Sequence, residues 1–213
     1  MIIALVNQKG GAGKTTTAVH FAYWLSVNSK VIVVDADRQK SSANWVQFLN
    51  LPCRVVSDPD ELFDLLSPLA QSFDYVIVDA PGNLREIVSV LLDRSDLALI
   101  PCKQSGLDLH STAETLRLIR QRQEVRGGKP LVSLFLNQAK KGTLLLRDSI
   151  QVLQESGFPV LKSIIYDRQC IMDAPGQRTT VWNLRSESAK QSASEFERLF
   201  KEVLEVLDEQ SKK

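Results

Sequence analysis

Short apolar runs alternate along the chain with longer stretches in which apolar residues recur every three or four positions. The apolar runs predict β-strands at residues 2–6, 31–34, 75–78, 97–100, 131–136 and 160–165. The amphipathic stretches predict helices near residues 15–27, 59–70, 84–92, 107–124 and 143–155. Several strands are apolar at nearly every position, which is typical of parallel strands covered on both faces. The pattern therefore predicts one α/β domain over residues 1–213, with a doubly wound, mostly parallel twisted sheet and helices on both faces.

One more helix is predicted at about residues 186–210. Its apolar residues are spaced three and four apart, which favours a helix docked on the core: Phe196, Leu199, Phe200, Val203, Leu204 and Leu207. A membrane-targeting helix is the alternative, but anionic lipid would repel the acidic polar face. No apolar run approaches the roughly 20 residues that span a bilayer. The apolar start is interpreted as a strand, since it lacks the basic residues and cleavage site of a signal peptide. We therefore expect no membrane contact.

Charge and cysteine content exclude several classes of protein. The formal net charge of +1 predicts no overall affinity for nucleic acid, so a DNA-binding surface has to be a local basic patch. Cys53, Cys102 and Cys170 are far apart and form no Cys-x-x-Cys pair. This spacing argues against a disulfide framework and against a zinc or iron–sulfur site, and favours small buried side chains in a reducing cytoplasm.

A glycine-rich segment at residues 7–16 carries the strongest chemical signal. It reads Asn-Gln-Lys-Gly-Gly-Ala-Gly-Lys-Thr-Thr and lies between a predicted strand and a predicted helix. Glycines let the backbone aim several N–H groups at a phosphate, and the helix N-terminus adds partial positive charge. In such a loop Lys14 reaches the β- and γ-phosphates, the Thr15 hydroxyl binds Mg²⁺, and Thr16 contacts the α-phosphate. With ATP and Mg²⁺ as cofactors, the predicted binding residues are Gly10, Gly11, Ala12, Gly13, Lys14, Thr15 and Thr16.

The loop departs from the common phosphate-loop pattern, because Gln8 replaces a first glycine and a second lysine, Lys9, follows it. In this it resembles the deviant Walker A box of the ParA/MinD family. The likeness covers almost the whole chain and is greatest to small plasmid-partition ParA proteins of the ParF type. It implies that Lys9 crosses a dimer interface to the partner's phosphates, as an arginine finger does. It also implies a two-fold homodimer in the ATP state, with both nucleotides between the protomers.

Carboxylates follow two of the predicted strands. The period-two spacing puts Asp35 and Asp37 on the same side as the chain leaves the sheet, where ligands of open α/β sheets bind. The resemblance implies that Asp37 orients the attacking water and that Asp35 helps to hold the Mg²⁺ shell. Asp79 matches the family's Walker B segment and would hold a Mg²⁺-bound water. The predicted metal residues are thus Thr15, Asp35 and Asp79, and the predicted catalytic residues are Lys9, Lys14 and Asp37.

Asn137 follows the predicted strand at 131–136, where family members use an asparagine to read the adenine edge. A buried amide suits this role because it both donates and accepts hydrogen bonds. A capping asparagine is the alternative. Residues 105–109 resemble the family's segment at the dimer face, and residues 165–169 resemble its late stretch near the base.

The leading functional hypothesis is a partition ATPase that segregates plasmid DNA. Such a protein would be cytoplasmic and associated with the nucleoid. The resemblance implies that the ATP dimer binds DNA without sequence preference. Hydrolysis is weak until a centromere-binding ParB-like protein or a cargo adaptor triggers it. Binding through phosphate contacts should fall steeply with salt. Candidate DNA contacts are Lys140, Lys141, Arg147, Lys162, Arg178, Arg185 and Lys190.

Three alternatives remain open. The same ATPase could position a protein cargo, such as carboxysomes, on the nucleoid. A MinD-like division regulator would cycle on a membrane, which the acidic C-terminal helix argues against. A metabolic P-loop ligase or kinase is the third alternative, but a monomeric kinase has no use for a trans-acting Lys9.

Overall fold

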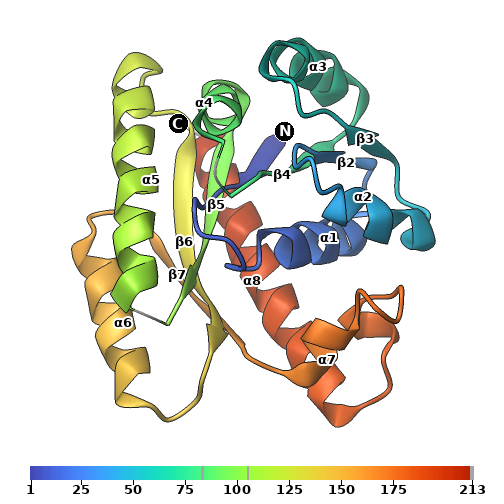
Figure 1. Ribbon diagram of the computed structural model, residues 1–213, viewed down its shortest axis with the longest axis vertical. Coiled ribbons are helices and arrows are strands. Elements are labelled where there is room, and N and C mark those ends of the chain that lie inside the picture. Colours follow the sequence, from blue (N-terminus) through green and yellow to red (C-terminus); the bar gives the residue numbers. More distant parts are fainter. Residues whose placement is uncertain (83, 105, 212–213) are drawn as a thin grey trace.

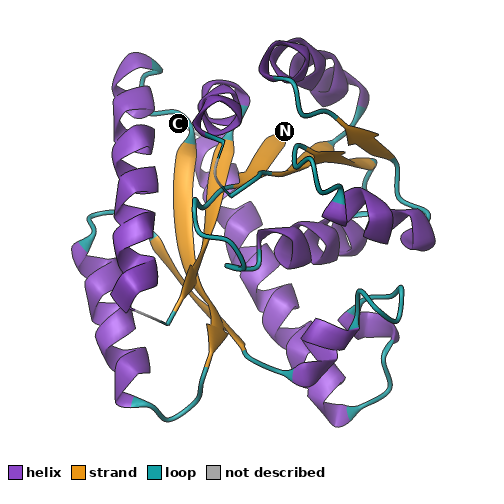
Figure 2. Cartoon of the chain, viewed as in Figure 1, coloured by secondary structure: helices purple, strands orange, loops and turns teal. Residues whose placement is uncertain are grey.

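A single parallel sheet forms the centre of the protein. The computed structural model describes residues 1–82, 84–104 and 106–211, without the side chains of residues 106–111 and 210–211. Among these residues, seven strands pair in the order β3-β2-β4-β1-β5-β6-β7, and every neighbouring pair is parallel (Figures 1 and 2). The strands are β1 (Ile2–Leu5), β2 (Val31–Asp35), β3 (Cys53–Val55), β4 (Tyr75–Asp79), β5 (Leu97–Lys103), β6 (Leu131–Ala139) and β7 (Val160–Tyr166).

Helices cover both faces of this sheet, which confirms the predicted fold class (Figure 1). They are α1 (Lys14–Leu25), α2 (Ser41–Val46), α3 (Pro59–Ser72), α4 (Arg85–Arg94), α5 (Gly106–Val125), α6 (Leu144–Glu155), α7 (Gln169–Asp173) and α8 (Glu187–Ser211), with the 3-10 turns η1 (Gln47–Leu49) and η2 (Val181–Asn183). The long crossovers follow from the parallel pairing, because parallel strands cannot be joined by tight turns.

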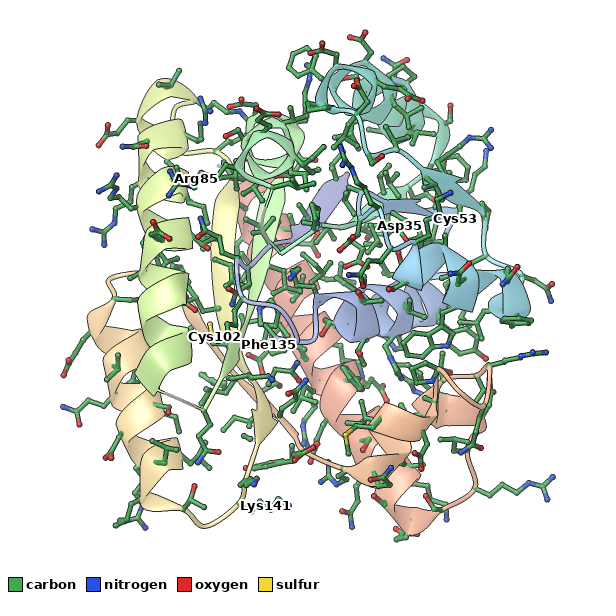
Figure 3. All side chains as sticks on the ribbon, in the orientation of Figure 1. Asp35, Cys53, Arg85, Cys102, Phe135 and Lys141 are labelled. Carbon is green, nitrogen blue, oxygen red and sulfur yellow. The ribbon has the colours of Figure 1, made fainter. Side chains whose placement is uncertain are left out.

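Alternating side chains of the strands supply two separate cores. In β1, Ile2 and Ala4 pack with α3, α4, α5 and α6 on one face of the sheet. Ile3 and Leu5 pack with α1, α2 and α8 on the other face. Phe135, near the centre of the molecule in Figure 3, is fully buried in this second core. Burial on both faces explains why these strands are apolar throughout.

The prediction that the strand beginning at residue 131 ends at residue 136 was wrong. β6 continues to Ala139, because its parallel pairing with β5 extends to the pair Lys103 and Asn137. Asn137 therefore lies within a strand. The short elements β3 and α2 were not predicted.

An aromatic cluster joins α1 to the C-terminal part of the chain. The ring of His20 stacks on Phe196 with centroids 4.6 Å apart and meets Trp45 edge-on at 5.4 Å. Its Nδ1 lies 2.7 Å from the Thr16 carbonyl oxygen, and its Nε2 accepts a hydrogen bond from the Val181 N–H at 3.3 Å. Since Nε2 accepts, the proton resides on Nδ1. The α1–α8 aromatic cluster comprises His20, Phe21, Tyr23, Trp24, Trp45, Trp182, Phe196 and Phe200.

Helix α8 uses its apolar side chains within the core. Phe196, Leu199, Phe200, Val203 and Leu207 are buried there, whereas Leu204 is only partly buried. The docking interpretation is therefore the one that the packing supports, and these buried residues are not available to lipid. In the part of the chain that the structure describes, no helix combines the length and the apolar content of a membrane span.

Candidate functional site

The segment between β1 and α1 is a phosphate loop in its geometry as well as its sequence. Asn7 is buried and fixes the start of the loop, because its Nδ2 donates to the Pro101 carbonyl oxygen at 2.8 Å while its Oδ1 accepts from the Lys9 N–H at 3.0 Å. Gly11 and Gly13 have φ angles of 72° and 95°, which favour glycine. The loop thus leads directly into the N-terminus of a helix of 12 residues, where anions bind.

Asn137 holds the loop from the side. Its Nδ2 donates to the Ala12 carbonyl oxygen at 2.8 Å, and the side chain is buried. A Cβ atom at Gly13 would lie 2.0 Å from this Nδ2, so Gly13 is required by close approach as well as by its φ angle. The capping alternative is not what the contacts show, since Asn137 reaches a loop 125 residues away. The adenine-reading role stays a prediction.

Lys14 and Asp79 lie beside one another at the base of the loop. The Lys14 Nζ donates to the Lys9 carbonyl oxygen at 3.3 Å, and burial lowers the pKa of Lys14 although Asp79 and Asp37 raise it. Burial raises the pKa of the Asp79 carboxyl to about 7, partly offset by a hydrogen bond from the Thr15 hydroxyl, 2.7 Å from Oδ2. Burial disfavours the charged form of both side chains. A phosphate beside Lys14 and a cation beside Asp79 would each stabilise that charged form.

The pair of Thr15 and Asp79 fits a Mg²⁺ ion. The Asp79 Oδ1 is buried and accepts no hydrogen bond from the described residues, which leaves an acceptor with an unmet need. A hydroxyl and a carboxylate oxygen are hard ligands of the kind that Mg²⁺ prefers, usually with several waters retained. In the described residues no group of three His, Cys, Asp or Glu side chains gathers in a way that could hold a metal ion.

Asp35 and Asp37 differ in their surroundings. Asp35 ends β2 in register with Asp79 of β4, and it is fully buried. Its two oxygens accept from the Asp37 N–H at 3.0 Å and from the Ala43 N–H at 2.8 Å, so it shapes the turn into α2. Asp37 is half-buried, and its Oδ1 accepts from the Gln39 N–H at 3.0 Å. The predicted role of Asp35 in a Mg²⁺ shell stays a prediction.

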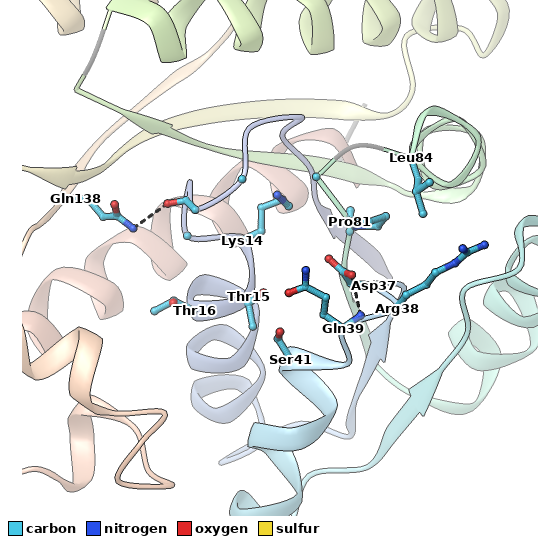
Figure 4. Close-up of a pocket in the computed structure, with 15 residues that line it drawn as sticks. Lys14, Thr15, Thr16, Asp37, Arg38, Gln39, Ser41, Pro81, Leu84 and Gln138 are labelled. Carbon is cyan, nitrogen blue, oxygen red and sulfur yellow. Dashed lines mark hydrogen bonds between the residues drawn. The ribbon is translucent and has the colours of Figure 1, made fainter.

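A cavity of about 540 Å³ lies against the loop and the carboxyl ends of β2 and β4. This loop cavity is lined by the loop itself and by Asp37, Gln39, Pro81 and Gln138, and Figure 4 labels these side chains together with Lys14. Of the predicted residues, Gly10, Gly11, Gly13, Lys14, Thr15, Thr16 and Asp37 line it. Arg38, Ser41 and Gln138 line it as well and were not predicted.

A second cavity of about 220 Å³ adjoins the first. This side cavity is lined by Asn137, Ile165, Tyr166, Met172 and Pro175 among others, and it shares Thr16 and Gln138 with the loop cavity. Its lining includes residues 165–168 of the stretch at 165–169 that was predicted to lie near the base. The size and the mixed apolar and amide lining suit a flat heterocycle.

The remaining predicted residues lie on the surface. Lys9 is exposed, as a lysine that acts on a second protomer has to be. The predicted dimer-face segment at 105–109 falls outside the described side chains. All seven candidate DNA contacts are exposed: Lys140, Lys141, Arg147, Lys162, Arg178, Arg185 and Lys190. Two of them lie over aromatic rings, Lys141 over Tyr166 at 4.7 Å and Arg178 over Phe48 at 4.4 Å.

Known proteins of similar sequence include carboxysome distribution proteins and ParA proteins. Over 95% of both chains, the protein is 29% identical to the maintenance of carboxysome distribution protein A of Halothiobacillus neapolitanus. It is 30% identical to protein ParA of Rhizobium radiobacter, but over 58% of each chain. The likeness to ParF-type partition proteins is not confirmed by these relatives.

Solved structures share the fold. An ATP complex of a Cyanothece McdA variant superposes with a TM-score of 0.78 at 19% identity, covering 95% of both chains. Cobyrinic acid a,c-diamide synthase from Mycobacterium smegmatis, with bound ADP and magnesium, covers 95% of this chain and 93% of its own with a TM-score of 0.70 at 18% identity. The predicted cofactors, ATP and Mg²⁺, agree with what these neighbours hold. Residues 3–181 match the CobQ/CobB/MinD/ParA nucleotide binding domain, and the chain belongs to this family.

Proposed function

We propose that this protein is an ATPase that uses ATP binding and hydrolysis to position a protein cargo, with carboxysomes as the example. The observation that carries the proposal is the likeness to a carboxysome distribution protein over 95% of both chains. The site supports it, because the loop cavity offers a phosphate loop, a buried lysine and a hydroxyl–carboxylate pair at one end of the sheet.

The chain's own residues would divide the work of hydrolysis. The loop N–H groups and Lys14 hold the phosphates, while Thr15 and Asp79 would hold the metal ion. When bound there, Mg²⁺ would supply positive charge that offsets the charge of the phosphates. Asp37, which lines the same cavity as Lys14, would orient the attacking water. Positioning is the expected contribution, since phosphoryl transfer needs little covalent help from protein.

Lys9 would complete the site of a second protomer. It is exposed at the start of the loop, and its backbone N–H donates a hydrogen bond to Asn7, which anchors the backbone there. A cation that reaches the partner's phosphates couples ATP binding to dimerisation. The ATP dimer would bind DNA without sequence preference through the seven exposed basic residues, and a cargo adaptor would trigger hydrolysis and release.

The first test is DNA retention by Asp37→Ala with ATP, with ADP and without nucleotide, across a salt series. The variant should keep ATP but hydrolyse it at least tenfold more slowly, because the attacking water loses its partner. It should be retained on duplex DNA with ATP alone, and retention should fall steeply with salt. Asp148→Ala, an exposed aspartate on α6, is the matched control. Undiminished turnover by Asp37→Ala would refute the role of Asp37, and absence of retention in every state would refute the DNA step.

DNA segregation, with a plasmid as the cargo, is the second candidate, and a relative named as a chromosome partitioning protein favours it. The two cargoes are separated by deleting the gene and following both in the same cells. Clustered protein compartments with stable plasmid inheritance would support the protein cargo. Plasmid loss with normally spaced compartments would support the partition function instead.

A further inference from the structure

Gln138 has an unusual backbone for a residue inside a strand. Its φ angle is 55°, in the left-handed region that a glutamine rarely adopts, and the pairing of β6 with β7 shifts register between Leu136 and Ala139. The irregularity turns two consecutive side chains, Asn137 and Gln138, toward the phosphate loop, although neighbours in a regular strand point to opposite faces. Such strain persists where the surrounding structure requires it, often at binding sites.

The side chain of Gln138 lies where the two cavities meet. Gln138 and Thr16 line both the loop cavity and the side cavity. A nucleotide with its phosphates in the loop cavity and its base in the side cavity has to pass between these two residues. The part of a nucleotide that joins phosphate to base is the ribose.

The amide has one polar atom engaged and one available. Its Nε2 donates to the Gly11 carbonyl oxygen at 3.2 Å, as the dashed line in Figure 4 shows. This bond fixes which end of the amide faces the loop. Among the described residues, none donates a hydrogen bond to its Oε1. An amide oxygen accepts readily from a hydroxyl group.

We propose that Gln138 accepts a hydrogen bond from a ribose hydroxyl of the bound nucleotide and makes the site selective against a nucleotide that lacks that hydroxyl. The inference rests on the proposed function for its nucleotide. It assigns to Gln138 a specificity role that its neighbour Asn137 does not share, because the Asn137 amide is buried against Ala12.

The test is a cycle of protein and ligand changes measured by calorimetry with Mg²⁺. Wild type, Gln138→Gly and Gln138→Leu are each titrated with ATP, 2′-deoxy-ATP and 3′-deoxy-ATP. Gln138→Gly keeps the backbone conformation without strain, so its fold is secure. Gln151→Ala, an exposed glutamine on α6, is the control.

Wild type and the control should bind ATP roughly five- to tenfold more tightly than one of the deoxy analogues, as expected for one hydrogen bond. Both Gln138 variants should bind ATP and that analogue equally. Discrimination that survives in both variants, or that wild type lacks, would overturn the role of Gln138 and leave the proposed function standing. Failure of wild type to bind any of the three nucleotides would overturn both.

Discussion

Asp35 and Asp79 lie opposite each other on neighbouring strands, but their carboxylates have different hydrogen-bond partners. Both carboxylate oxygens of Asp35 accept hydrogen bonds from backbone N–H groups that follow it in the chain. The carboxylate therefore stabilises the backbone that leads into α2. Asp79 accepts a hydrogen bond from the Thr15 hydroxyl at Oδ2, whereas its buried Oδ1 has no hydrogen-bond donor among the described residues. Their hydrogen bonds, and not their positions in the sheet, distinguish a carboxylate that supports the backbone from one that can take a cation.

His20 gives the molecule a pH-dependent stability. Burial lowers its pKa to about 4 from an ordinary value of 6.5. The unfolded chain therefore binds a proton between pH 6.5 and 4 that the folded chain does not, so the free energy of unfolding falls as the pH falls through this window. At about 1.4 kcal/mol per pKa unit, the loss approaches roughly 3 kcal/mol.

His20→Phe isolates this contribution, because it keeps the stack on Phe196 and removes the titrating ring. Urea denaturation at several pH values from 4 to 7 should give the variant a shallower loss than wild type, by roughly 3 kcal/mol over the window. The carboxyl groups titrate in both proteins, so their contributions to the pH dependence cancel in the comparison. Parallel pH profiles would mean that His20 is not the group responsible.

The sequence could reveal those site residues that lie together in short motifs, but not those that depend on contacts between distant parts of the chain. Lys14, Thr15 and Asp79 lie in short motifs at the ends of apolar runs, so pattern alone locates them. Gln138 and the clamp from Asn137 to Ala12 join residues more than 120 positions apart, and no local pattern records such contacts. Gln138 carries one signal in the sequence, its place beside Asn137, but the left-handed backbone that turns it toward the loop has no signature there.

At the scale of elements, the wall of the side cavity depends on an ion pair between the β7–α7 loop and α8. Arg168 donates from Nη2 to the Glu195 Oε1 at 2.7 Å and from Nη1 to Oε2, and both side chains are nearly buried. Glu195 also accepts from the Tyr166 N–H, at the free edge of β7. Helix α8 thereby fixes the strand end and the start of α7 together.

Glu195→Gln should lower the free energy of unfolding by about 2 kcal/mol, between the cost for a buried pair and that for a surface pair, because it leaves the partly buried Arg168 guanidinium without its counter-charge. Chemical denaturation measures the change. Glu187→Gln on the same helix, whose pair with Lys190 is exposed, should change stability by less than about 1 kcal/mol. Equal effects of the two substitutions would show that the Arg168 pair contributes no more than a surface contact.

Element prediction succeeded where burial is two-sided and failed where it is not. The central strands are apolar at nearly every position, so the sequence locates β1, β2 and β4 and the start of β5, which was predicted to end at residue 100 and continues to Lys103. β3 has only three residues, two of them exposed at the edge of the sheet, and α2 has six residues, too few for a helical period. β6 was cut short because its last residues are polar, although they face the site and not solvent alone.

At the scale of the whole molecule, Lys9→Ala should abolish the ATP-dependent dimer and reduce hydrolysis by about 10³-fold, as for loss of an arginine finger, while ATP affinity changes by less than about tenfold. Sedimentation velocity with and without ATP measures the assembly. Lys201→Ala, exposed on α8, is the control. An intact ATP-dependent dimer in Lys9→Ala would remove Lys9 from the trans role.

The aromatic cluster makes the protein its own optical probe. All three tryptophans of the chain, Trp24, Trp45 and Trp182, belong to it, so the tryptophan fluorescence comes from this junction of α1 and α2 with the C-terminal part of the chain. The same junction begins four residues from Thr16, through the ring of His20. A shift of α1 against α8 would therefore change the emission of an unlabelled sample, and stopped-flow mixing with nucleotide would time that movement without a dye.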